Sequence, residues 1–225
     1  MIQAVLFDLD GTLLDRDTSL KLFIQDQYDR YLDKLNHVPK TIFVDRFIEL
    51  DNHGYVWKDK VYQALIHECE PVGLTWEGLL QDYLDHFPRF TVAFPNTEEV
   101  LKWLRNQNIK IGLITNGFTK FQQANLGSLH IEGYFDEILI SEEEGVRKPD
   151  PEIFRRAFNR LKVHASNCIF VGDHPINDVK ASMNAGAIGV WKRNDHGAIE
   201  VEPDRIIDDL VEIKSILENL KDEID

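Results

Sequence analysis

Acidic residues, one hydroxyl and one lysine follow successive apolar runs of the chain, at the points where those runs end. The segments that follow the first four runs are, in order, Asp8-Leu9-Asp10-Gly11-Thr12, Thr115-Asn116-Gly117, Gly145-Val146-Arg147-Lys148-Pro149-Asp150 and Gly172-Asp173-His174-Pro175-Ile176-Asn177-Asp178. If the runs are parallel strands, their carboxyl ends meet at one edge of a sheet, where open α/β sheets bind their ligands. The sequence therefore predicts a reaction centre at that edge.

These residue types suit phosphoryl transfer. Clustered carboxylates repel one another and raise each other's pKa, and Mg²⁺, which prefers oxygen ligands, relieves that repulsion. Lys148 adds a second cation, and Thr115 with nearby backbone N–H groups can hold phosphate oxygens. A carboxylate can also act as a nucleophile and form an aspartyl-phosphate. We therefore expect a magnesium-dependent reaction on a phosphorylated substrate.

The composition limits the partners of the protein. The 225 residues include 25 Lys and Arg against 39 Asp and Glu, a net charge of −14. Such a charge repels polyanions and disfavours nucleic acid or an anionic membrane as a partner. No segment approaches the roughly 20 apolar residues of a membrane span. Cys69 and Cys168 fit no metal-binding spacing and are interpreted as free thiols of a reducing compartment, so we predict a cytoplasmic protein.

Short apolar runs predict a parallel sheet with helices between its strands. Runs of this length suit strands that are buried on both faces. The predicted strands are Ile2–Phe7, Ile109–Ile114, Glu137–Ile140, Cys168–Val171 and Ala187–Trp191. The predicted helices between them are Glu98–Asn106, Phe121–Leu129, Pro151–Leu161 and Pro175–Ala185. This alternation indicates an α/β fold with a doubly wound, Rossmann-like parallel sheet.

A helical block interrupts the alternation after the first strand. It has no convincing strand, and its predicted helices are Ser19–Leu35, Lys40–Asp51, Lys58–Cys69 and Trp76–Phe87. We predict two domains: a catalytic core of residues 1–14 and 90–225, and an inserted all-helical cap of residues 15–89.

The four strand-end segments resemble the four motifs of the haloacid dehalogenase-like superfamily. Asp8-Leu9-Asp10-Gly11-Thr12 is similar to its first motif and Thr115-Asn116 to its second. Lys148 is similar to the third motif, and Gly172-Asp173 with Asp178 to the fourth. The motifs occur in order along the whole core, and the inserted helices resemble the family's first class of cap.

The resemblance implies catalytic roles for four residues. Asp8 would be the nucleophile that attacks phosphorus. Asp10 would protonate the leaving oxygen and then act as base toward the water that hydrolyses the aspartyl-phosphate. Thr115 would bind the transferring phosphoryl group, and Lys148 would neutralise charge between Asp8 and phosphate.

The resemblance also implies which residues bind the phosphate and the metal. Gly11, Thr115, the Asn116 amide and Lys148 would form the phosphate site. The Mg²⁺ ligands would be Asp8, Asp173 and the backbone carbonyl of Asp10. Asp178 would support the metal through water or orient Lys148.

The same scaffold serves several reactions, and Asp10 discriminates among them. Members that cleave carbon–halogen bonds or phosphonates lack an acid two residues after the nucleophile. The sequence therefore favours a phosphatase that hydrolyses a phosphomonoester of a small metabolite. A phosphomutase or phosphotransferase remains the alternative, and a non-catalytic phosphoacceptor module resembling a receiver domain is less favoured because of the inserted helices. We expect a monomer.

Several other polar and aromatic residues have a simpler interpretation. His174 is expected to pack in its loop rather than to act as a base. Arg16, Arg46, His53 and Lys58 are interpreted as solvated helix-face charges, with contact to a distal group of the substrate left open. The four tryptophans lie within apolar patterns and are predicted to be core residues: Trp57, Trp76, Trp103 and Trp191.

Overall fold

The computed structural model describes residues 1–194 and 201–222, which form two compact units. The core unit comprises Met1–Asp15 and Ala93–Asp225, and the helical unit comprises Arg16–Val92. Residues 195–200 and 223–225, which belong to the predicted core, lie outside the described residues.

The core unit contains a parallel β-sheet. Within the described residues it has six strands, in the order β3-β2-β1-β4-β5-β6. The strands are β1 (Ala4–Phe7), β2 (Lys110–Thr115), β3 (Glu137–Ile140), β4 (Cys168–Gly172), β5 (Ile188–Lys192) and β6 (Arg205–Ile207). Every pairing is parallel, so the predicted fold class is confirmed, with β6 as an additional, unpredicted strand.

The central strands are apolar on both faces, as their sequences predict. In β1, Val5 and Phe7 enter one hydrophobic cluster, whereas Ala4 and Leu6 enter another on the opposite face. Phe7 is paired with Leu113 and Val171, so β2 and β4 end within two residues of the end of β1. This alignment brings the residues that follow the three strands to one edge.

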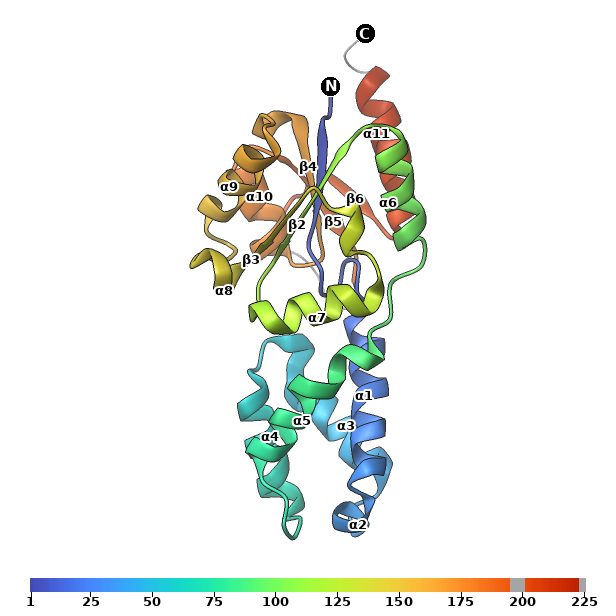
Figure 1. Cartoon of the computed structure of the whole chain (residues 1–225), viewed down its shortest axis with the longest axis vertical. Helices are drawn as coiled ribbons and strands as arrows, with labels where there is room; N and C mark the ends of the chain where they lie inside the picture. Colours follow the sequence, from blue (N-terminus) through green and yellow to red (C-terminus); the bar gives the residue numbers. More distant parts are fainter. Residues whose placement is uncertain (195–200, 223–225) are drawn as a thin grey trace. The chain divides into compact units, whose positions relative to one another are not determined.

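Helices cover both faces of the sheet. The core helices are α6 (Thr97–Asn106), α7 (Thr119–Leu129), α8 (Ser141–Glu144), α9 (Pro151–Leu161), α10 (Ala181–Asn184) and α11 (Ile213–Asp222). Figure 1 shows α6 and α11 on one face and α9 and α10 on the other. Helix α7 instead runs across the carboxyl end of the sheet (Figure 1).

Proline is the first residue of α9 and of the π-helical turn that precedes α10. Asp150 caps α9 by accepting a hydrogen bond from the Glu152 N–H, and Pro151 follows at the first helical position, where its missing N–H does no harm. The predicted helix Pro175–Ala185 is a π-helical turn over Pro175–Lys180 that continues into α10. A single regular helix is therefore the wrong description of that segment.

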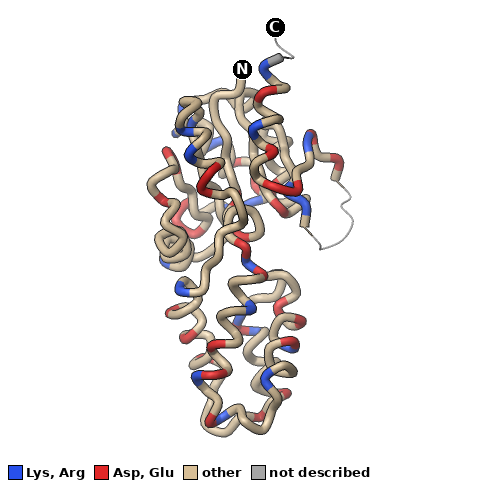
Figure 2. Tube along the Cα trace, turned by 90° about the vertical axis from the view of Figure 1, so that its right-hand side faces the viewer, with Lys and Arg blue, Asp and Glu red and all other residues tan. Residues whose placement is uncertain are grey.

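The helical unit contains no strand among its residues 16–92, all of which the structure describes. Its helices are α1 (Arg16–Arg30), α2 (Leu32–Leu35), α3 (Lys40–Asp51), α4 (Lys58–Cys69) and α5 (Trp76–His86). Short 3₁₀ turns occur here and in the core at Asn52–Gly54, Phe87–Phe90, Glu132–Tyr134, Ala165–Asn167 and Leu210–Glu212. Acidic and basic residues are interspersed over the helical unit (Figure 2).

Two interpretations of charged and aromatic residues in this unit are wrong. Arg16 and Lys58 are largely buried rather than solvated, because both bind the carboxylate of Asp51, which is itself 1% exposed. Arg16 does so through two hydrogen bonds of 2.8 and 2.9 Å. Trp57, predicted to be a core residue, is 62% exposed because it precedes α4 at its N-terminal boundary instead of packing from a helix face.

The helical unit is attached to the core unit at two neighbouring points. On the core side of each connection, Leu14 and Ala93 form an isolated antiparallel β-bridge. The Phe94 N–H also donates to the Leu13 carbonyl at 2.9 Å. The departing and returning chain segments of the core are therefore hydrogen-bonded to each other.

Two features of the chain bear on the composition arguments. Within residues 1–194 and 201–222, the helices are too short or too polar for any of them to cross a membrane. Cys69 and Cys168 are both free thiols, and burial raises the pKa of Cys168 to about 12.

Candidate active site

A buried lysine joins two carboxylates at the carboxyl end of the sheet. The Lys148 ammonium donates to Asp8 Oδ1 and to Asp178 Oδ1, at 2.6 Å in each case. All three residues are at most 6% exposed. Asp8 follows β1, Lys148 follows α8, and Asp178 lies in the π-helical turn after β4, so three separate segments meet here as predicted from the strand ends.

Asp173 completes a cluster of acidic groups. Carboxylate oxygens of Asp8, Asp173 and Asp178 lie within 4.8 Å of one another. The Asp173 carboxylate accepts a hydrogen bond of 3.2 Å from the Asn194 amide. Gly11 lies against it: a Cβ atom at this position, where φ is +84°, would be 2.3 Å from Asp173 Oδ2. The glycine is therefore required for the close approach of the Asp8–Gly11 loop to Asp173.

The pKa values of the cluster are shifted because its carboxylates are buried close to one another. Burial raises the pKa of Asp8 well above its usual value, and the charges of Asp178 and Asp173 raise it further, against the opposing effect of Lys148. Burial together with the Asp178 charge raises the pKa of Asp173 to about 7. The two carboxylates raise the pKa of Lys148 in spite of its burial. One lysine therefore does not balance the negative charge of the cluster.

Thr115 and Asn116 connect the end of β2 to the lysine. Thr115 is 1% exposed. The Asn116 side chain makes two hydrogen bonds of 3.0 Å to the backbone of Lys148, one to its carbonyl and one from its N–H. The side chain of Asn116 thus fixes the loop that carries Lys148, and the backbone N–H of Asn116 is not part of this clamp.

His174 and Asp178, which lie close to Asp173 in the chain, have different roles. His174 accepts hydrogen bonds of 3.1 Å from the N–H groups of Ile176 and Asn177 through Nδ1, so it caps the turn that follows, in line with its predicted packing role. Asp178 is not the cap of that turn. Its second oxygen accepts a 2.9 Å bond from the His174 N–H, which orients the carboxylate toward Lys148.

Asp10 contacts a residue that the sequence reasoning missed. Gln122 of α7, which is 2% exposed, donates to Asp10 Oδ2 and to Thr115 Oγ1 at 2.7 Å each. Asn125, fully buried one helical turn later, donates to Gln122 Oε1 at 3.0 Å. Two amide residues at an i, i+3 spacing, in the helix that follows Thr115-Asn116, are the sequence signal that could have revealed this pair.

Lys192 is a second missed residue. It ends β5, is 4% exposed and donates to the Gly11 carbonyl at 3.3 Å. Its ammonium lies 3.3 Å from the centre of the Phe94 ring. Burial lowers the pKa of Lys192. The residue thus joins the loop after β1 to the segment that returns from the helical unit.

The sequence and the fold of the chain are similar to those of known proteins. A family model described as haloacid dehalogenase-like hydrolase matches residues 5–191. A glyceraldehyde 3-phosphate phosphatase of Methanocaldococcus jannaschii is 29% identical over 98% of this chain and 99% of its own length. A phosphoglycolate phosphatase of Neisseria gonorrhoeae is 30% identical, with coverages of 98% and 95%. The crystal structure of a phosphatase from Thermococcus onnurineus is similar with a TM-score of 0.68 and 28% identity, over 96% of this chain and 98% of that one.

Proposed function

Since the chain belongs to the haloacid dehalogenase-like hydrolases and is a phosphatase of that family, we propose that it hydrolyses phosphomonoesters of small metabolites through an aspartyl-phosphate on Asp8, with Mg²⁺ as cofactor. The observation that carries the proposal is the buried contact of Asp8 with Lys148 beside Asp173 and Asp178. A carboxylate held by a cation at a strand end can attack phosphorus, and the remaining acids supply oxygen ligands for a metal ion.

The donor set fits Mg²⁺. Three carboxylates within 4.8 Å of one another offer only oxygen ligands. Burial raises the pKa values of Asp8 and Asp173, and neighbouring acids raise them further, so a divalent cation would stabilise the ionised carboxylates. Asp8, Asp173 and the backbone carbonyl of Asp10 would hold the ion, and Asp178 would support it through water or by orienting Lys148. When bound, the ion supplies positive charge that offsets the negative charge of the transferring phosphoryl group.

In the first half of the reaction, Asp8 attacks phosphorus and forms an O–P bond while the ester P–O bond breaks. Asp10 gives its proton to the leaving oxygen, and the alcohol departs. In the second half, Asp10 takes a proton from water as that water attacks the phosphorus of the aspartyl-phosphate. Inorganic phosphate leaves, the Asp8 carboxylate is regenerated and Asp10 is protonated again, so the cycle is balanced.

The phosphate oxygens would be held by groups that surround Asp8. The Thr115 hydroxyl, the Asn116 backbone N–H and the Lys148 ammonium are the proposed donors, with Gly11 allowing close approach of the chain. Such fixed donors stabilise charge that spreads over the phosphoryl oxygens during transfer.

The helical unit, Arg16–Val92, is the proposed cap. Its insertion directly after the loop that carries Asp8 and Asp10 supports this role, because caps of this kind exclude water and select substrates by size. The names of the relatives suggest short phosphorylated metabolites as the first substrates to test.

The first test is phosphate release from p-nitrophenyl phosphate, glyceraldehyde 3-phosphate, phosphoglycolate and glycerol 3-phosphate, with and without Mg²⁺. The comparison includes Asp8→Asn and a control, Asp33→Asn, at an exposed position. Magnesium-dependent release that is lost only in Asp8→Asn supports the proposal. A folded wild-type protein that releases phosphate from none of these substrates contradicts it, and ³¹P NMR of sugar phosphates would reveal a phosphomutase by transfer without release.

A further inference from the structure

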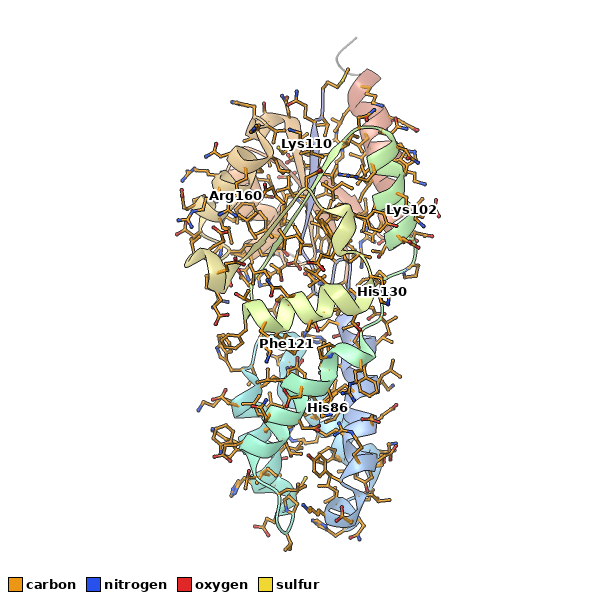
Figure 3. The ribbon with its side chains drawn as sticks, viewed as in Figure 1. His86, Lys102, Lys110, Phe121, His130 and Arg160 are labelled. Atoms are coloured by element: carbon orange, nitrogen blue, oxygen red, sulfur yellow. The ribbon has the colours of Figure 1, made fainter. Side chains whose placement is uncertain are left out.

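Gln122 contacts both the proposed acid, Asp10, and the proposed phosphate-binding residue Thr115. Its Nε2 atom lies 2.7 Å from Asp10 Oδ2 and 2.7 Å from Thr115 Oγ1. Phe121 and His130 mark the two ends of α7 in Figure 3, and Gln122 lies in its first turn. A single amide nitrogen therefore contacts one carboxylate oxygen of Asp10 and the hydroxyl oxygen of Thr115.

The chemistry of the amide fixes the direction of both hydrogen bonds. The NH₂ group has two hydrogens and no acceptor capacity. Asp10 and Thr115, both at 2.7 Å, are its two nearest acceptors, and the Asn116 carbonyl lies farther away at 3.4 Å, so one hydrogen goes to Asp10 and the other to Thr115. The Thr115 oxygen therefore acts as an acceptor toward Gln122, and its own hydrogen is left to donate to a phosphoryl oxygen. Asp10 is held through Oδ2, which leaves Oδ1 to carry the proton.

The orientation of the amide is determined by its neighbours. Asn125 donates to Gln122 Oε1 at 3.0 Å, and both side chains are buried. A flipped Gln122 would place Oε1 against the Asp10 carboxylate and Nε2 against the donor of Asn125, and both contacts would be repulsive. With Asn125 as the donor to Gln122 Oε1, the Gln122 NH₂ group faces Asp10 and Thr115.

The local backbone leaves room for this side chain. A Cβ atom on Gly117, which follows Asn116 at the end of β2, would lie 2.9 Å from Gln122 Cγ. The absence of a side chain at Gly117 lets α7 approach the strand end closely enough for its first turn to reach Asp10.

We infer that Gln122 is a positioning residue that holds Asp10 and Thr115 in the geometry for proton transfer and phosphoryl binding. The inference rests on the proposed function. Its consequence is specific: an Asp10 side chain that is free to rotate protonates the leaving oxygen poorly. Esters with a strongly basic leaving group depend on that proton, whereas p-nitrophenolate leaves without it.

The test compares Gln122→Met with Gln123→Met. Met keeps the length of the glutamine and removes both donors, and Gln123 is exposed on the same helix. The kcat is measured for p-nitrophenyl phosphate and for the alkyl phosphate of the substrate panel that the wild type hydrolyses fastest. We expect Gln122→Met to lose about 10- to 100-fold more kcat on the alkyl phosphate than on p-nitrophenyl phosphate. Gln123→Met should match the wild type on both.

A second variant, Gln122→Glu, tests the inference if Gln122→Met does not fold. Gln122→Glu keeps the shape of the side chain but replaces the donor with an acceptor, and should show the same dependence on the leaving group. Equal losses on the two substrates in a folded variant would overturn the positioning role while leaving the proposed function intact. No activity of the wild type on either substrate would overturn the proposed function and the inference together.

Discussion

Replacement of Lys148 by methionine tests whether the acidic cluster depends on one internal cation. Met has a similar length and fills the space of the lysine stem, so the change removes charge and hydrogen bonds with little loss of packing. In the wild type, the ammonium is 2.6 Å from Asp8 and 2.6 Å from Asp178. Without it, Asp8 and Asp178 lose the cation that they share, beside the carboxylate of Asp173.

The magnitude follows from the distances. At an effective dielectric constant of about 20, two unit charges separated by 2.6 Å attract by about 6 kcal/mol. The cost of removing the ions from water offsets most of this attraction, and removal of one partner of a buried pair destabilises proteins by about 3–5 kcal/mol. Because two anions lose their partner at once, we expect Lys148→Met to lower the free energy of unfolding toward the upper end of that range.

Urea unfolding at pH 7 in the presence of a chelator measures this difference. Lys180→Met is the matched control, since Lys180 is exposed next to the same site and its loss should change stability by less than about 0.5 kcal/mol. Added Mg²⁺ should narrow the gap between Lys148→Met and the wild type, because the cation would replace part of the missing charge. A loss below about 1 kcal/mol in the chelator would refute the reasoning, since the carboxylates would then not require a cation in the folded state.

Three further predictions concern the loop after β1, the metal and the helical unit. Gly11→Ala places a methyl group 2.3 Å from Asp173 Oδ2 at a φ of +84°; thermal unfolding should show a loss of about 1–3 kcal/mol, and an unchanged melting temperature would contradict it. Mg²⁺ at about a hundred times its Kd should stabilise the wild type by about 2.7 kcal/mol. The same stabilisation in Asp173→Asn would argue against this site. Burial of Asp82 acts to raise the pKa of its carboxyl group, but hydrogen bonds from Arg30 and Gln27 have the larger combined effect, so the pKa of Asp82 is lowered. The contribution of ionised Asp82 to the free energy of unfolding is complete above about pH 4, the pKa of an unfolded Asp. It disappears as the pH falls through the lower pKa that Asp82 has in the folded protein. Arg30→Met should therefore be less stable than the wild type by about 1.5–3 kcal/mol at pH 7, with a gap that narrows at lower pH; a gap independent of pH in urea titrations would contradict this.

The sheet was predictable from the sequence because its central strands are buried on both faces. Their apolar runs are nearly continuous, and polar residues end them abruptly. The strand β6, Arg205–Ile207, gave no such signal, since two of its three residues are exposed at the edge of the sheet. Helices α3 and α4 begin and end where the sequence predicts, because proline or glycine turns flank them.

The meeting of Asp8, Thr115, Lys148, Asp173 and Asp178 was also predictable, because the carboxyl ends of parallel strands share one edge. The roles of these residues stay proposals. Gln122 and Lys192 were not predicted, since their contacts depend on how α7 and the end of β5 approach the loop after β1. The same limit explains the wrong interpretation of Arg16, whose partner Asp51 is 35 residues away along the chain.

The β-bridge between Leu14 and Ala93 pairs the two core segments that flank the helical unit. Because the core residues at its two ends are already hydrogen-bonded, a turn of a few residues is long enough to join them directly. The hydrogen-bonded contact between the two core segments therefore does not require a particular length of the inserted segment. We therefore expect an insert of another length at this position to leave the register of β1, β2 and β4 unchanged.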